Sequence, residues 1–184
     1  MPVQAAADRV AARMRRQYDR ALVRDVVAEI GRALPGAGLG TDVIAGFPGE
    51  SEADFEAGLA LLEGLPFTSL HVFPYSKQSG TTAAKAGDHL PPPIIAARAA
   101  RLRQLGAAKR RAFAERFVGR PVRVLVERAR DAASGRLIGY SRRYVRVVLD
   151  GPDDWGNREI AARGVARLGD RLLARAGEGT IRGE

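Results

Sequence analysis

Thr41-Asp-Val-Ile-Ala-Gly-Phe-Pro-Gly-Glu50 is the segment of this chain that says most about the fold. Its first half is apolar and β-branched, as in a short buried strand, and its second half is a Gly-Phe-Pro-Gly turn. Glycine lets a backbone approach a ligand closely, and parallel sheets bind ligands at the carboxyl ends of their strands. The segment therefore predicts either the end of a ligand-binding strand or a purely structural joint between a strand and a helix.

The residues around this segment alternate between helical and extended patterns. Asp19 is a good N-cap for the helix that precedes the segment, and Ser51 with Asp54 resembles a capping box for the helix that follows it. This alternation predicts parallel βα units. Pro2-Val3-Gln4 is interpreted as too short to be a strand with a partner. The expected elements are helices over 7–16, 20–34 and 51–64 and strands over 39–45 and 67–73.

The second half of the chain has a different sequence pattern. A loop over 74–93 precedes a helix over 94–117, and Gly119-Arg120-Pro121 is the best domain boundary. Short Val-rich segments separated by glycines then predict a small antiparallel barrel. The predicted domains are therefore residues 1–118 and 119–184. The strands expected in the barrel are 122–127, 144–149, 158–168 and 171–174.

Composition excludes several kinds of site. The 184 residues include no Cys and only two His, so this chain predicts no disulfide, no cysteine nucleophile and no metal site of its own. We assign no catalytic residue. An apolar run long enough to cross a membrane is missing, and the N-terminus lacks the apolar core of a signal peptide. The expectation is a cytoplasmic protein without a membrane partner.

Charge is distributed unevenly along the chain. Residues 36–93 carry a net charge of −5, whereas residues 94–184 carry 21 basic and 10 acidic side chains. Such a basic region predicts either binding to a polyanion such as RNA or the solvated surface of an arginine-rich protein.

Several segments together resemble one enzyme family. The stretch 41–50 is similar to the strand-five motif of radical S-adenosylmethionine enzymes, and segments within 8–18 and 70–76 resemble the tRNA methylthiotransferases among them. Residues 110–119 look like the linker helix of that family, and 121–174 look like its TRAM domain, an OB-like RNA-binding barrel. The resemblance implies an α/β plus all-β chain. A partial radical-SAM (βα) barrel, including the helix over 94–117, would precede the TRAM barrel.

The resemblance also implies a function. Members add a methylthio group to the modified adenosine 3′ of the anticodon, using S-adenosylmethionine and [4Fe–4S] clusters, and 70–76 most resembles the threonylcarbamoyladenosine branch. The cluster-binding Cys motif of the family would lie upstream of Met1, so no cluster is expected in this chain alone. The chain also has Ala5-Ala6-Ala7 where the family has Ser-Gly-Ser, and Gln78 where the family usually has Arg. The alternatives are a non-enzymatic RNA-binding protein and an inactive gene remnant.

Residue by residue, the resemblance implies a cofactor wall. Arg16 matches a family Arg that suits the cofactor carboxylate, or it is a solvated side chain. Ile44 packs on the cofactor adenine or belongs to the core, and Tyr75 contacts the cofactor or covers the barrel as a loop aromatic. The implied cofactor-binding residues are Gln4, Arg16, Ile44, Gly46, Phe73 and Tyr75.

The second domain has its own candidate residues for binding tRNA. Alternation along a strand would place Arg142, Tyr144 and Arg146 on one face, with Arg143, Val145 and Val147 on the other. Guanidinium groups bind phosphates and an aromatic ring stacks on a base. The alternative is a solvent face with a half-buried Tyr. The candidate RNA-binding residues are Arg120, Arg123, Arg142, Tyr144 and Arg146.

Overall fold

The computed structural model describes residues 2–177. The chain divides into two compact units, Met1–Ala107 and Ala108–Glu184. Hereafter these are the N-terminal unit and the C-terminal unit. The division falls within helix α4 (Pro92–Glu115). Leu102 of α4 packs in the core of the first unit and Phe113 in the core of the second. None of the helices among residues 2–177 has the length and apolarity needed to cross a membrane.

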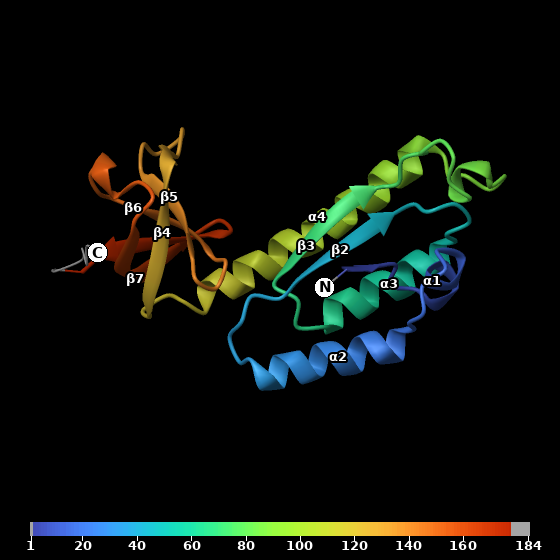
Figure 1. Cartoon of the computed structure of the whole chain (residues 1–184), viewed down its shortest axis with the longest axis horizontal. Helices are drawn as coiled ribbons and strands as arrows, with labels where there is room; N and C mark the ends of the chain where they lie inside the picture. Colours follow the sequence, from blue (N-terminus) through green and yellow to red (C-terminus); the bar gives the residue numbers. More distant parts are fainter. Residues whose placement is uncertain (1, 178–184) are drawn as a thin grey trace. The chain divides into compact units, whose positions relative to one another are not determined.

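The N-terminal unit is built on a three-stranded parallel sheet in the order β1-β2-β3 (Figure 1). The neighbours β2 and β3 are aligned from Gly40 opposite Ser69 to Ala45 opposite Pro74. The alternation of helices and strands in the sequence predicted parallel βα units, and the parallel sheet confirms this prediction. The elements are β1 (Pro2–Gln4), α1 (Asp8–Arg13), α2 (Arg20–Ala33), β2 (Gly40–Ala45), α3 (Glu52–Gly64), β3 (Ser69–Pro74) and a 3₁₀ turn η1 (Ala83–Lys85).

The interpretation of Pro2-Val3-Gln4 as an unpartnered tail is wrong. These residues form β1, which pairs with β2 in parallel. Val3 is buried in the core, and its backbone N–H donates to Thr41 Oγ1 at 3.1 Å. Three residues suffice here because burial against the sheet stabilises the pairing, a contribution that no local pattern reveals. The first helix is also shorter than expected, because Arg15 has a φ of 56° and the helix ends at Arg13.

Both predicted helix caps are confirmed. The Asp19 side chain accepts a hydrogen bond from the backbone N–H of Leu22 at 2.8 Å, and Ser51 forms a complete capping box with Asp54. Leu34, included in the helix expected over 20–34, is the C-cap that follows α2 and stays 60% exposed. The core of the unit is formed mainly by Val3, Val23, Val27, Val43, Phe55, Leu62, Leu70 and Leu102.

The C-terminal unit is a closed five-stranded barrel in the order β4-β5-β6-β8-β7, with β7 pairing back to β4. Four of its strand pairs are antiparallel, whereas β6 and β8 run parallel, so the barrel is mixed rather than wholly antiparallel. β8 is the second strand of the β7–β8 hairpin, and its other edge closes the barrel by pairing in parallel with β6. The elements are β4 (Pro121–Arg130), β5 (Leu137–Ser141), β6 (Arg146–Leu149), η2 (Asp153–Trp155), β7 (Glu159–Leu168) and β8 (Arg171–Ala176).

The sequence missed β5 and placed the start of β6 too early. Gly139 lies within β5, and a Cβ there would approach Leu125 O of β4 to 2.3 Å, so the close contact of the two strands requires a glycine. A turn follows, in which Tyr144 N–H donates to Ser141 O at 2.8 Å, and β6 begins only at Arg146. The chain is nevertheless α/β followed by all-β, as expected. Residues 178–184 of the predicted second domain lie outside the described residues.

Candidate functional site

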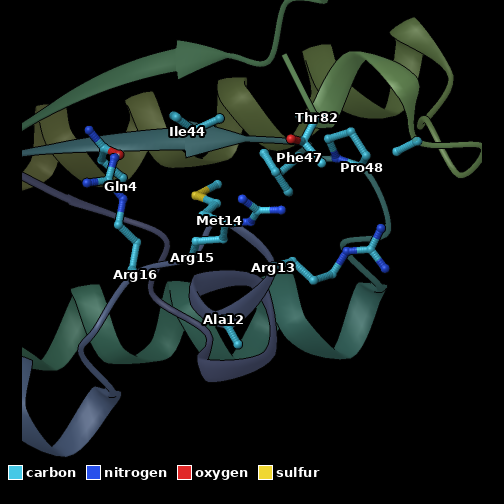
Figure 2. Close-up of a pocket in the computed structure, with 12 residues that line it drawn as sticks. Gln4, Ala12, Arg13, Met14, Arg15, Arg16, Ile44, Phe47, Pro48 and Thr82 are labelled. Carbon is cyan, nitrogen blue, oxygen red and sulfur yellow. The ribbon is translucent and has the colours of Figure 1, made fainter.

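A cavity of about 560 Å³ opens in the N-terminal unit, where the chain leaves the carboxyl ends of β1 and β2 (Figure 2). Its walls come from four separate segments: the end of β1, the end of α1 with the following turn, the end of β2 with the following turn, and the loop around η1. This is the position in which parallel sheets bind ligands. The lining residues are Gln4, Ala12, Arg13, Met14, Arg15, Arg16, Ile44, Phe47, Pro48, Thr82, Ala83 and Ala86.

Part of the cavity lining is polar and basic. Arg16 Nη2 donates a hydrogen bond to Gln4 Oε1, and Figure 2 shows the two side chains meeting. Arg13 Nη2 donates to Asp88 Oδ2 at 2.7 Å. Gln4 and Arg15 both have positive φ, 53° and 56°, a sparsely populated conformation for non-glycine residues. Strained backbone of this kind is common at ligand sites, and the guanidinium groups suit an anionic group.

Most of the remaining lining is apolar. Ile44 and Phe47 contribute aliphatic and aromatic surface, together with Met14. The ring of Phe47 packs edge-on against Tyr75 with centroids 5.6 Å apart, and Tyr75 lies 5.8 Å from the ring of His89. A cavity lined by both guanidinium groups and apolar surface fits a small ligand that carries both a carboxylate and a planar ring.

A buried ion pair fixes the turn that carries Phe47. Glu50 Oε2 accepts from the backbone N–H of Gly46 at 3.0 Å and from Arg98 Nη1 of α4 at 2.7 Å. Burial raises the pKa of the Glu50 carboxyl above its ordinary value, while Arg98 and the Gly46 N–H oppose that rise. Gly46 has a φ of 78°, and a Cβ there would approach Ile95 Cγ1 to 2.7 Å. Arg98 Nη1 also donates to Glu50 O at 2.9 Å, so the turn is tied to α4 through both side chain and backbone.

A second ion pair ties α1 to α3 behind the turn. Arg9 Nε donates to Asp54 Oδ2 at 3.1 Å, and Arg9 Nη2 donates to Gly49 O at 2.6 Å. The hydrogen bond from Arg9 is the main cause that holds the pKa of the Asp54 carboxyl well below its usual range. Asp54 thus serves both the capping box of α3 and the contact with α1.

The structure brings three of the six cofactor candidates together. Gln4, Arg16 and Ile44 line the cavity, and Gly46 lies in the turn that carries Phe47. The other two candidates, on β3 and just after it, lie outside the lining. Phe73 is aligned with Ile44 and is 52% exposed. Tyr75 packs on Phe47, and its buried hydroxyl has no hydrogen-bond partner among residues 2–177.

The predicted RNA-binding residues lie on the surface of the barrel, but not as one strand face. The predicted alternation from Arg142 to Arg146 is wrong, because residues 141–145 form a turn in which Tyr144 has a φ of 59°. Tyr144 is 81% exposed at this turn, and Arg143, expected on the inner face, is exposed as well. Arg120, also exposed, precedes β4 and its carbonyl accepts from Gly164 N–H at 2.9 Å.

The chain is similar in sequence to several curated tRNA-modifying enzymes. It is 40% identical over 77% of its length to a tRNA-2-methylthio-N(6)-dimethylallyladenosine synthase of Salinispora arenicola. It is 37% identical over 92% of its length to the protein of the same name from Parafrankia sp.. It is 33% identical over 84% of its length to the threonylcarbamoyladenosine tRNA methylthiotransferase MtaB of Bacillus subtilis.

The chain is related to the tRNA methylthiotransferases. It spans 29%, 34% and 35% of the length of these three curated relatives. No family model matches it. Relatives named for dimethylallyladenosine and for threonylcarbamoyladenosine occur at similar identity. The similarity therefore relates the chain to the methylthiotransferases as a group and does not distinguish these two branches.

The residues of this chain do not fit an iron–sulfur cluster. Such clusters are held chiefly by Cys thiolates, and the sequence contains none. Within the part of the chain that the structure describes, no group of three His, Asp or Glu side chains comes together as a metal site. The cavity, by contrast, has the donors and the apolar wall that a small organic ligand needs.

Sequence reasoning missed four residues of these sites. Arg98 carries no local signal, because a lone Arg on a helix looks the same whether it is buried or solvated. Glu50 ends the quoted motif, and its position after the glycine turn was the available signal. On the barrel surface, Glu159 accepts hydrogen bonds from Arg123 and Arg142, 36 and 17 residues away, and no local pattern reveals such distant partners. Tyr140, exposed on β5 opposite Leu125, was missed because β5 itself was not recognised.

Proposed function

We propose that this chain is the C-terminal part of a tRNA methylthiotransferase. In this proposal the N-terminal unit forms one wall of an S-adenosylmethionine site, and the C-terminal unit is a TRAM domain that binds tRNA. The supporting observation is the cavity itself, which joins Gln4, Arg16 and Ile44 from three separate segments, in a chain whose relatives are named for this activity. The proposed reaction adds a methylthio group to a modified adenosine beside the anticodon.

The cavity residues would bind and orient the cofactor. Arg16, already positioned by Gln4, would bind the carboxylate of S-adenosylmethionine, because a guanidinium matches carboxylate geometry. Ile44 and Phe47 would pack against the adenine ring, and the apolar wall would exclude water from it. When bound, S-adenosylmethionine supplies the methyl group. Iron–sulfur clusters would have to be held by residues outside this chain.

We further propose the threonylcarbamoyladenosine branch as the substrate class. The segment Leu70-His-Val-Phe-Pro-Tyr-Ser76 supports this assignment, because it most resembles that branch. The test is binding of the whole chain to anticodon stem-loops that carry either threonylcarbamoyladenosine or dimethylallyladenosine. Tighter binding to the dimethylallyl form would contradict the branch while leaving the enzyme family standing.

The experiment that tests the proposed function is a pair of titrations on the whole chain. A labelled tRNA should bind with an affinity that falls steeply with salt, and S-adenosylhomocysteine should bind at the cavity. Arg16→Ala should weaken only the second interaction. Arg32→Ala is the matched control, because Arg32 pairs with Glu29 on the surface of α2 and lies outside the cavity lining. A chain that binds neither tRNA nor the cofactor analogue would disprove the proposal.

A second candidate function is RNA binding without catalysis. It is favoured by the cysteine-free sequence together with the basic C-terminal unit, which has 18 basic and 10 acidic side chains. This candidate predicts that tRNA binds while S-adenosylhomocysteine does not. The two titrations therefore separate the two functions.

A further inference from the structure

The outer surface of the barrel carries an exposed apolar pair surrounded by arginines. Leu125 of β4 and Tyr140 of β5 are directly opposite each other and are 56% and 39% exposed. Arg146 of β6 is the next partner of Tyr140, and Arg123 lies two residues before Leu125 on the same side of β4. We define the barrel face as Arg123, Leu125, Tyr140, Arg142, Arg146 and Glu159, on β4, β5, β6, β7 and the turn after β5 (Figure 1).

A single carboxylate holds two of the three arginines of the barrel face. Glu159 Oε2 accepts from Arg123 Nη2 at 2.9 Å and from Arg142 Nη2 at 2.8 Å. Glu159 Oε1 accepts from Arg142 Nε at 2.5 Å. In the register of the sheet Glu159 is opposite Leu125, so its charge lies beside the apolar pair. The local charge of the two arginines is thereby halved.

The ion pairs lie on a unit whose net charge suits RNA. The 18 basic and 10 acidic side chains of residues 108–184 leave a net charge of +8. The Arg142 side chain is 70% exposed although it contacts Glu159, so it remains accessible to a phosphate. A phosphate must displace Glu159 to bind these guanidinium groups. Because exposed ion pairs contribute little free energy, this competition lowers the affinity for phosphate without abolishing it.

We propose that the barrel face binds an unpaired RNA base on Tyr140 and Leu125, and that Glu159 restrains Arg123 and Arg142 from binding phosphate. This inference rests on the proposed RNA-binding function of the barrel and deepens it. Phosphate contacts are independent of sequence, whereas contacts to bases carry recognition. By occupying two guanidinium groups, Glu159 lowers the contribution of phosphate contacts to the binding affinity, a contribution that any polyanion could provide. It thus makes binding depend on the stacked base.

The proposal predicts opposite effects for two variants. Tyr140→Ala should weaken binding of a single-stranded RNA by about 5- to 150-fold, the equivalent of 1–3 kcal/mol for a stacked base. Its binding to inorganic polyphosphate, a polyanion without bases, should not change. Tyr140→Phe keeps the ring and should bind RNA as the wild type does.

Glu159→Gln removes the charge while keeping the size of the side chain. We expect tighter binding to both RNA and polyphosphate, with a log–log salt slope steeper by about 0.7 for each additional phosphate contact to single-stranded RNA. Asp150→Asn is the matched control. It removes the same charge from the same unit but releases Arg136, which precedes β5 at the end remote from Arg146 and outside the barrel face.

The test is titration of the whole chain and each variant with both polyanions at several salt concentrations, with thermal melts to confirm folding. Leu125→Gln is a second variant of the apolar pair, in case Tyr140→Ala does not fold. A wild-type chain that fails to bind RNA at low salt would overturn the proposed RNA-binding function itself. RNA binding that both apolar-pair variants leave unchanged, or a gain from Asp150→Asn equal to that from Glu159→Gln, would overturn only the present inference.

Discussion

The two units of this chain offer different kinds of binding surface. The N-terminal unit has a net charge of +1, and its candidate site is a cavity built by the segments that follow the ends of parallel strands. The C-terminal unit has a net charge of +8, and its candidate site is the outward face of a closed barrel. A parallel sheet binds ligands at the ends of its strands. A small barrel is filled by its own side chains, so only its outer surface is open to ligands.

The units also differ in how deeply their ion pairs are buried. In the N-terminal unit Arg98 is only 5% exposed and holds Glu50 within the fold, so this ion pair supports the structure. In the C-terminal unit the arginines that face Glu159 remain largely accessible. Removing a charge should therefore destabilise the first unit, and in the second unit it should mainly change the affinity for ligands.

Arg98→Met should produce the largest loss of stability. It leaves the carboxylate of Glu50 buried without its partner, which costs about 3–5 kcal/mol when a buried pair is broken. The helical signal in circular dichroism should melt at a lower temperature. Fluorescence of Trp155, the only tryptophan and a residue that packs against the barrel core, should keep its transition.

The control for Arg98→Met is Arg136→Met, which breaks the exposed pair with Asp150 and should cost only about 0–1 kcal/mol. If both signals shift together in Arg98→Met, the two units unfold as one, and the contrast between them fails.

Two glycine substitutions should each weaken one unit. Gly139→Ala would push a Cβ against Leu125 O at 2.3 Å, and Gly46→Ala would push one against Ile95 Cγ1 at 2.7 Å with an unfavourable positive φ. Overpacking of this kind costs about 1–3 kcal/mol, and more where backbone rather than side chain must move. Gly139→Ala should lower the Trp155 transition and Gly46→Ala the helical one. The reverse assignment would contradict the packing described for the two glycines.

Acid should weaken the N-terminal unit through Asp54. Because Arg9 lowers the pKa of this carboxyl in the folded state, its stabilising contribution is complete above the unfolded pKa of about 3.9. That contribution is lost as the pH falls from this value through the folded pKa. Urea unfolding followed by circular dichroism between pH 5 and pH 2 should show the loss. Asp54→Asn should reduce stability at pH 7 and flatten the acid dependence, and an unchanged pH profile would contradict the role of Arg9.

Tyr144→Gly should have the smallest effect on stability, and in the opposite direction. Tyr144 is 81% exposed and has a φ of 59°, a conformation that costs an ordinary residue about 1–2 kcal/mol and glycine almost nothing. After the extra flexibility of glycine in the unfolded chain is subtracted, we expect a gain of up to about 1 kcal/mol in the Trp155-monitored free energy of unfolding. A loss would show that the Tyr144 ring stabilises the barrel. Weaker tRNA binding by the stabilised variant would mark Tyr144 as a ligand contact.

Local patterns predicted the elements whose stability is local. The N-cap Asp19 and the capping box of Ser51 and Asp54 each act within four residues, so the sequence alone reveals them. The alternation of helices and strands likewise predicted a parallel sheet, and the glycine turn at 46–49 marked the strand end at which the cavity opens. The resemblance in these segments led to the same enzymes as the comparison with named relatives.

Only the tertiary structure decided the features that depend on distant partners. β1 exists because Val3 is buried beside Thr41, 38 residues away, and the pairing of Leu125 with Tyr140 depends on a register that Gly139 permits. The burial of Arg98 and the two arginines on Glu159 are equally invisible in the sequence, because a charged side chain looks the same there whether its partner is water or a carboxylate. Local hydrogen bonds and periodicity are encoded in neighbouring residues, whereas burial and ion pairing are properties of the packed chain.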